Sequence, residues 1–236
     1  MNDSKYIGDE LSLFKDAGNW KQYWYNSVQQ FVKGDLLEVG AGIGINTNLI
    51  LQNCKTITSL IAIEPDALLS CQIKGNINAN KSNADVKIHT GYLSDLDVSQ
   101  KFDTIIYIDV IEHIENDKEE MLKAKDHLKD GGHLIILVPA YNFLFSPFDK
   151  AIGHFRRYNK RMLLHSVPND LKNLELFYLD SLGACASLVN KLFLKQSYPT
   201  KVQIQKWDNL IVPSSKVVDK ILFNSIGKSL IGVWRK

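Results

Sequence analysis

Short apolar segments alternate with amphipathic segments through the first 140 residues of the chain. The apolar segments end at turns or glycines and are predicted to be strands, at 35–39, 59–63, 86–89, 102–108 and 133–138. Helices are predicted between them, at 45–53, at 66–80, where the helix is polar, and at 115–129, where it is charged. Residues 130–132 are Asp-Gly-Gly and predict a turn. Strands that alternate with helices form a parallel sheet, and their apolar character indicates burial on both faces.

An aromatic segment precedes the first strand. Residues 19–33 carry Trp20, Tyr23 and Trp24 at helical spacing and predict an amphipathic N-terminal cap helix. These side chains and Tyr25 could close over a ligand as a lid, or they could be the core face of an ordinary helix. We expect at least two of the four to be core residues.

The last third of the chain changes its pattern. Strands are predicted at 174–179 and 229–234, separated by a helical insertion at about 184–225. Within the insertion, 186–196 and 214–224 have helical apolar spacing, and the first of them could touch a membrane surface, although core packing is the stronger interpretation. A long excursion between strands is often functional, so we expect the insertion to shape acceptor specificity. No linker or repeat divides the chain, and residues 1–236 are predicted to form one domain.

Composition narrows the functional classes. Hydrophobic residues make up 45% of the 236 residues, charged residues 23%, and the net charge is +2, which gives no reason to expect nucleic acid as a partner. The three cysteines have no CxxC spacing, and no apolar run reaches membrane-spanning length. The first residues are polar and contain no signal-like apolar region. We therefore expect a cytoplasmic protein without integral membrane association.

The first predicted strand ends in a glycine loop. Glycines stand at Gly40, Gly42 and Gly44, with Glu38 two residues ahead and Ala41 between the first two. A strand, a glycine loop and a helix form a nucleotide-like binding site in open α/β sheets. The dinucleotide fingerprint would need a glycine at position 45, where this chain has isoleucine. A carboxylate ahead of the loop suits a cofactor with a sulfonium and an ammonium better than a pyrophosphate.

A second carboxylate stands at the end of the next strand. Glu64 follows Gly40 by twenty-four residues and could accept both hydroxyls of a ribose. The alternatives are a simple tight turn for the glycine loop and a solvated strand end for Glu64. The two features together favour the binding site.

Several motifs in order resemble those of class I S-adenosylmethionine-dependent methyltransferases. The matching segments are LLEVGAGIG, LIAIEPD, TGYLSDL, FDTIIYIDVIEHIEND and DGGHLIILVPA, within residues 34–140. The resemblance implies a Rossmann-like, doubly wound, mostly parallel seven-stranded sheet with the last strand antiparallel. It also implies S-adenosylmethionine as cofactor. Its contacts would then be the glycine loop for the methionyl part, Glu64 and Pro65 at the ribose, Leu93 and Ser94 at the adenine, and Ile108, Asp109 and Val110 along the methionyl part.

Two histidines are candidate general bases for the acceptor. His113 follows the fourth predicted strand, at the carboxyl edge where such sheets bind ligands. It is the first candidate, with the alternative that it only packs the turn. His154 lies in a second cluster after the fifth predicted strand, with Arg156, Arg157 and Tyr158.

The second cluster indicates the chemistry of the acceptor. The two arginines and Tyr158 could bind an anionic acceptor, or the arginines could pair with Asp149. The stretch GHFRRY also resembles a bacterial subgroup of these methyltransferases that acts beside sugar- and lipid-modifying enzymes. The predicted partner is therefore a small-molecule or carrier-linked acceptor, methylated on oxygen or nitrogen.

Other site types have weaker support. No metal-binding spacing, no nucleophilic Ser or Cys motif and no NPPY or Pro-Cys motif occurs, so no metal and no nucleic-acid methylation is expected. A nicotinamide dehydrogenase shares the sheet, but Ile45 argues against it. A non-catalytic sensor or partner subunit that binds S-adenosylmethionine stays an alternative.

Overall fold

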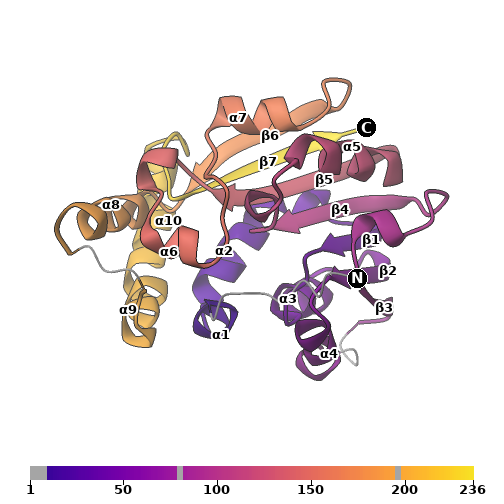
Figure 1. The fold of residues 1–236 in the computed structure, drawn as a ribbon, viewed down its shortest axis with the longest axis horizontal. Coiled ribbons are helices and arrows are strands. Elements are labelled where there is room, and N and C mark those ends of the chain that lie inside the picture. The colour runs from indigo at the N-terminus through magenta and orange to yellow at the C-terminus, as the bar shows by residue number, and fades with distance from the viewer. Residues whose placement is uncertain (1–9, 79–81, 195–197) are drawn as a thin grey trace.

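Seven strands form one mixed sheet in the order β3-β2-β1-β4-β5-β7-β6 (Figure 1). The computed structural model describes residues 10–78, 82–194 and 198–236. The strands are β1 (Gly34–Val39), β2 (Ile57–Glu64), β3 (Asp85–Thr90), β4 (Phe102–Ile108), β5 (Leu128–Pro139), β6 (Lys172–Leu179) and β7 (Ser229–Arg235). The first five are parallel, and β7 runs antiparallel between β5 and β6. The predicted Rossmann-like fold is confirmed, including its antiparallel last strand.

Helices cover both faces of the sheet. The α-helices are α1 (Glu10–Phe14), α2 (Gly18–Val28), α3 (Ile45–Asn53), α4 (Ala67–Asn76), α5 (Asp117–His127), α6 (Pro147–Ala151), α7 (Lys160–Ser166), α8 (Ser181–Val189), α9 (Lys201–Lys206) and α10 (Val212–Ile221). Shorter turns are the 3-10 helices η1 (Gln29–Phe31), η3 (Leu93–Asp95), η4 (Ile111–His113) and η5 (Asn142–Leu144), and the π-helices η6 (Asn190–Leu194) and η7 (Trp207–Ile211). Figure 1 shows α8, α9 and α10 together at one end of the molecule, with α4 and β3 at the other.

The alternation of strand residues explains the two-sided core. Ile135 and Leu137 of β5 belong to the cluster that packs against α2 and α3, whereas Ile136 and Val138 belong to the cluster that packs against α5 and α7. Successive residues of a strand point to opposite faces, so a strand covered by helices on both faces must be apolar throughout. The apolar runs in the sequence therefore mark the central strands.

The fifth strand differs from its prediction. It begins at Leu128, so the turn predicted at 130–132 lies inside β5. Phe102 pairs with Leu128 and Thr104 with His133, so the register shifts across this stretch and the additional residues form a bulge. Gly131 adopts φ 78°, which glycine tolerates and a bulge can use. Parallel pairing with β4 resumes at His133, where the predicted strand began.

Three predicted segments extend outside the described residues. The end of the helix predicted at 66–80, the end of that predicted at 186–196 and the polar first residues all do so. Within the described residues, α4 ends at Asn76 and α8 continues into the π-helix η6, which ends at Leu194. The aromatic segment forms α2 and η1. Together they begin at Gly18, one residue before the predicted start, and end at Phe31, two residues before the predicted end.

Candidate active site

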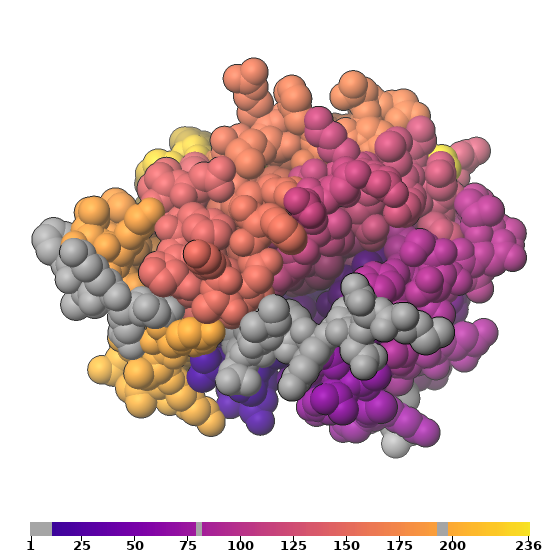
Figure 2. Space-filling view, in the orientation of Figure 1, coloured from indigo at the N-terminus to yellow at the C-terminus, as the bar shows by residue number. Residues whose placement is uncertain are grey.

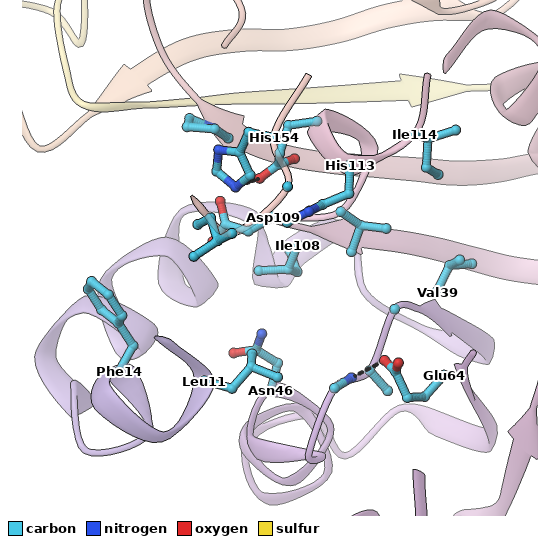
Figure 3. Close-up of a pocket in the computed structure, with 18 of the residues that line it drawn as sticks. Leu11, Phe14, Val39, Asn46, Glu64, Ile108, Asp109, His113, Ile114 and His154 are labelled. Carbon is cyan, nitrogen blue, oxygen red and sulfur yellow. Dashed lines mark hydrogen bonds and ion pairs between the residues drawn. The ribbon is translucent and has the colours of Figure 1, made fainter. Parts of the chain in front are cut away.

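A cavity of about 750 Å³ opens at the carboxyl edge of the sheet (Figure 3). The last residue of each of four parallel strands lines it: Val39, Glu64, Ile108 and Pro139. Figure 3 shows Glu64 on one side of the cavity and His113, His154 and Asp109 gathered on the other. The cavity therefore has two ends with different chemistry, a Glu64 end and a His154 end.

The glycine loop forms the floor of the Glu64 end. Gly40, Gly42 and Gly44 all have positive φ, at 72°, 57° and 83°. A Cβ on Gly40 would lie 2.5 Å from a methyl group of Val110, so glycine is required there for space as well as for conformation. Gly40, Ala41 and Gly42 line the cavity. Gly44, which stands at the start of α3, packs against Ile73 of α4 instead.

Glu64 holds the loop in place and faces the cavity. One of its carboxylate oxygens accepts the N–H of Gly42 at 2.8 Å, and the other accepts the N–H of Asp66 at 3.0 Å. Burial raises the pKa of Glu64, and these two hydrogen bonds oppose that shift. Each oxygen keeps a second acceptor site, so the carboxylate can still receive hydroxyl donors from a ligand.

Glu38 lies outside the cavity, in contrast to its predicted role. Its carboxylate accepts the hydroxyl of Thr47 at 2.5 Å, within the interior beneath α3. Burial raises its pKa to about 7. The acid ahead of the loop therefore joins β1 to α3 and does not face a ligand. Ser94 also lies outside the lining, whereas its neighbour Leu93 and Pro65 line the cavity.

The turn that follows β4 begins at Asp109. Asp109 has φ 54°, a left-handed conformation that aspartate adopts more readily than most residues, and its N–H donates to the carbonyl of Leu137 at 2.9 Å. The chain then turns through Val110 into η4. Ile108, Asp109 and Val110 all line the cavity.

Asp149 organises the other end of the cavity. Its Oδ1 lies 3.0 Å from Nδ1 of His154 and accepts Nε of Arg157 at 2.7 Å, while its Oδ2 accepts Nη2 of Arg157 at 2.9 Å. Burial alone would raise the pKa of Asp149, but the hydrogen bonds from His154 and Arg157 outweigh burial and hold it below its usual range. A charged Asp149 fixes the proton of His154 on Nδ1, which leaves Nε2 as an acceptor.

His113 and Glu112 complete this cluster. Burial and the neighbouring His154 lower the pKa of His113 to about 4, and the two rings meet edge to face with centroids 4.5 Å apart. Glu112 is fully buried, and neither carboxylate oxygen accepts a hydrogen bond from another described residue. Burial, and then the charge of Asp109, raise the pKa of Glu112 well above its usual range.

The same cluster has metal-ligand geometry. Glu112, His113 and His154 each offer one ligand atom, and these atoms lie within 4.8 Å of one another. The sequence predicts no metal, because the spacing of these residues matches no metal motif. Glu112, His113 and His154 could therefore hold a divalent ion together.

Arg156 and Tyr158 lie away from the cavity. Arg156 donates to the carbonyl of Glu115 at 2.7 Å and pairs with Asp117 at 3.0 Å. Tyr158 is fully buried in the core and donates its hydroxyl to Asp117 at 2.7 Å. Neither residue lines the cavity, whereas Arg157 lines it while paired with Asp149. Arg156 and Tyr158 are therefore not positioned to contact an acceptor in the cavity.

Lys228 is a cavity residue that the sequence did not indicate. It precedes β7, and its ammonium lies 4.7 Å from the ring centroid of Trp207. Burial lowers its pKa, and Asp180 opposes that shift. No hydrogen bond or ion pair joins its Nζ to another described residue, so the Nζ can donate a hydrogen bond to a ligand in the cavity. The only signal in the sequence is its place at a strand end.

The aromatic helix α2 contributes core residues, as expected for at least two of its four aromatic side chains, and it also forms part of the cavity wall. Trp20 and Trp24 line the cavity, while Tyr25 is buried in the core and packs edge to face on Trp24. Asp208 holds the start of α2 by accepting the N–H of Trp20 at 2.8 Å. Further lining residues of this wall that the sequence did not indicate are Leu11, Phe14, Asn46, Phe148 and Trp207.

Comparison with known proteins identifies the fold's relatives. A family model described as "Methyltransferase domain" matches residues 20–191. The chain belongs to this methyltransferase family. Its match includes the glycine loop, Glu64 and the cluster of His113 and His154. The family match and the fold together place the chain among the class I methyltransferases, a family that uses S-adenosylmethionine.

Similar curated proteins are methyltransferases of one named pathway. The chain is 30% identical over 115 residues to the ubiquinone biosynthesis O-methyltransferase of Rickettsia bellii, an alignment that spans 48% of this chain and 43% of that protein. That of Rickettsia typhi is 27% identical over 112 residues, with 48% and 42% covered. The chain thus matches less than half the length of these relatives.

Similar solved structures share the fold at low identity. An S-adenosylmethionine-dependent methyltransferase of Archaeoglobus fulgidus is 13% identical, with a TM-score of 0.62 over 96% of this chain and 97% of that chain. Phosphoethanolamine N-methyltransferase 2 of Haemonchus contortus, in complex with S-adenosylmethionine, is also 13% identical, with a TM-score of 0.61 over 96% and 55%. In the described part of this chain, no helix has the length and apolar character needed to cross a bilayer.

Proposed function

We propose that this methyltransferase methylates an oxygen of a small-molecule or carrier-linked acceptor that binds beside His154. The observation that carries the proposal is the 3.0 Å contact between Asp149 and Nδ1 of His154 at the end of the cavity opposite Glu64. It prepares Nε2 to take the proton that an acceptor hydroxyl or amine loses on methylation, and the name of the Rickettsia bellii relative favours oxygen of the two.

The Glu64 end of the cavity fits the cofactor. S-adenosylmethionine, when bound, supplies an electrophilic methyl group on a sulfonium that leaves as a neutral thioether. Glu64 would accept the ribose hydroxyls with the oxygen sites it has left. The cavity-lining glycines leave space without a Cβ, and Ile108, Asp109 and Val110 would border the methionyl part. Glu38, Gly44 and Ser94 would support this site from outside.

His154 is a better general base than His113. A histidine whose pKa is about 4 holds a proton too weakly to take one from a hydroxyl near neutral pH, and His113 is such a residue. His154 is oriented by a charged Asp149, which stabilises the imidazolium that forms when Nε2 receives the proton. His113 would pack against the His154 ring and limit its rotation.

The acceptor end favours an apolar molecule with one polar or anionic group. Its walls are aromatic, with Phe14, Phe148 and Trp207, and Lys228 offers a hydrogen-bond donor beside them. This replaces Arg156 and Arg157 as the basis for an anionic acceptor, because both arginines are paired with carboxylates. The name of the Rickettsia bellii relative supports an oxygen acceptor. The GHFRRY subgroup, the cytoplasmic location and the absence of a nucleic-acid partner are kept as predictions.

The test compares two histidine variants. Labelled S-adenosylmethionine is supplied with a panel of phenols, hydroxy acids and amines, and turnover and S-adenosylhomocysteine affinity are measured separately. We expect His154→Gln to lower kcat about 10²- to 10⁴-fold with cofactor affinity unchanged, and the matched His113→Gln to lower it less. Equal losses would contradict the assignment of the base. Tight cofactor binding with no turnover on any acceptor would favour the non-catalytic alternative, and loss of turnover on chelation would favour a metal at the cluster.

A further inference from the structure

The helical segment between β6 and β7 presents an unusual surface. Eleven of the eighteen large hydrophobic side chains that are exposed among the described residues lie between 188 and 226. Phe223 is 90% exposed, Ile221 68% and Val217 61%. Figures 1 and 2 show that the segment from α8 to α10, coloured orange to gold, forms one end of the molecule. Scattered apolar side chains are normal on a surface, but a concentration of them in one segment indicates an interaction site.

Helix α10 buries two polar residues, Ser215 and Asp219, beside the apolar Val212, and exposes two large apolar ones beside Ser214 and Lys220. Asp219 is fully buried and accepts the hydroxyl of Tyr23 at 2.8 Å and the N–H of Asp180 at 2.7 Å. Ser215 is also fully buried and donates to Asp180 at 2.7 Å. On the outer face, Val217 and Ile221 stand one turn apart. Val217 and Ile221 thus form an apolar strip on the exposed side of the helix, and such a strip is suited to an apolar environment.

The charges of the segment are sorted in the same way. Residues 181–226 contain two acidic residues, Asp208 and Asp219, and both are buried in hydrogen bonds. They contain six lysines, and Lys206 and Lys220 are exposed without an ion pair. The charge presented outward is therefore positive only. An apolar face bordered by lysines complements a bilayer that carries anionic lipid headgroups.

The end of α10 holds Phe223 outward. Phe223 has φ 51°, a left-handed conformation that is unfavourable for an aromatic residue. The next residue, Asn224, has φ 51° as well and is tied to Tyr178 of β6 by two hydrogen bonds, at 2.9 and 3.1 Å. The strained turn is thus anchored to the sheet and leaves the ring in solvent. Strain that persists at an exposed position points to function.

We propose that the exposed face of the segment 210–226, which comprises the end of η7, α10 and the turn after it, binds the surface of an anionic membrane. The apolar side chains would enter the interface between headgroups and acyl chains, and Lys206 and Lys220 would contact the headgroups. Trp207, three residues before Leu210, lines the cavity, so the proposed membrane face adjoins the acceptor end. This inference does not depend on the methyl transfer proposed above.

The test is co-sedimentation of the full chain with vesicles. One set is phosphatidylcholine, and the other is an equimolar mixture of phosphatidylcholine and phosphatidylglycerol. We expect binding to the mixed vesicles, weakened by salt, and much weaker binding to the neutral ones. S-adenosylhomocysteine affinity is measured on the same protein and is expected to be unchanged by every variant below.

Two matched pairs of variants sharpen the test. Phe223→Gly removes the ring and suits the positive φ, so we expect an unchanged or higher Tm with roughly tenfold weaker vesicle binding. Leu68→Ser, at a residue of α4 that is 69% exposed, is the control and should bind as wild type. Lys220→Gln should weaken binding about fivefold, whereas Lys172→Gln on β6 should not.

Three outcomes would overturn the proposal. They are no binding to the mixed vesicles, equal loss in the Leu68→Ser control, and a dimer in light scattering that Phe223→Gly dissociates. The last result would assign the face to a second copy of the chain. Weaker sedimentation of Phe223→Gly with the mixed vesicles, at a retained Tm, would support the membrane proposal.

Discussion

The two ends of the cavity are built in different ways. At the Glu64 end, the glycine loop follows its own strand directly, and Glu64 reaches Gly42 across only one strand pairing. At the His154 end, the groups come from separate parts of the chain: Asp149 and His154 follow β5, His113 follows β4, and Lys228 precedes β7. The Glu64 end, where we propose that the cofactor binds, therefore depends on local backbone geometry, whereas the His154 end, the proposed acceptor end, depends on buried polar contacts between distant segments.

The largest effect should come from breaking the acceptor end. Asp149→Ala would leave Arg157 buried without its partner, and we expect the free energy of unfolding to fall by about 3–5 kcal/mol. Urea denaturation checks this value. The control is Asp85→Asn, which removes an exposed pair with Lys87 and should change stability by less than about 1 kcal/mol. If folded Asp149→Ala keeps its S-adenosylhomocysteine affinity, the two ends are energetically separate.

Breaking the cofactor end should affect binding more than folding. Gly40→Val combines a positive φ with a contact to Val110 that is too close, so we expect S-adenosylhomocysteine affinity to fall at least about 100-fold by calorimetry. Gly75→Ala in α4 is the matched control, because a Cβ there meets nothing within 4 Å. Retained affinity in Gly40→Val would mean that the loop does not hold the cofactor.

Glu38 gives the cofactor end a pH dependence. Burial holds its pKa near 7 in the folded chain against 4.5 in its ordinary state, so between these values the folded state binds more protons than the unfolded state. Its contribution to stability is complete below pH 4.5 and is lost as the pH rises through 7. We expect Glu38→Gln, compared with wild type, to be more stable by about 2 kcal/mol at pH 8 than at pH 5. An identical difference at both pH values, by urea denaturation, would refute a protonated Glu38.

The smallest effect marks the border of the acceptor end. Arg156 pairs with Asp117 outside the cavity, so Arg156→Ala should change the acceptor's KM by less than about twofold and stability by about 1 kcal/mol or less. Steady-state kinetics with an acceptor found in the panel checks the first value. A KM raised tenfold would restore Arg156 as an acceptor contact.

The same contrast explains what could be predicted from the sequence. Apolar runs indicated the strands, and the glycine loop with Glu64 indicated the cofactor end, because each is a local pattern with a physical cause. Residue types alone did not show that Glu38 bonds to Thr47 instead of a ligand. The sequence indicated that the loop after β5 carries candidate acceptor residues. It did not show that Arg157 is the arginine that pairs with Asp149, because that depends on how the loop folds back.

Long-range contacts were beyond the sequence. Lys228 shares the cavity with Asp109, from which 119 positions separate it, and no local pattern links them. Asp208 fixes the start of α2 from 188 positions away. The bulge in β5 was predicted as a turn because Asp-Gly-Gly is typical of both, and only pairing with β4 decides between them.

A crystal structure of the chain with S-adenosylhomocysteine would show where the cofactor binds. We expect ribose hydroxyls on the carboxylate of Glu64 and the cofactor's sulfur directed toward the end of the cavity that holds His154. Density elsewhere on the molecule, or a sulfur turned away from His154 with its path closed by protein, would contradict it.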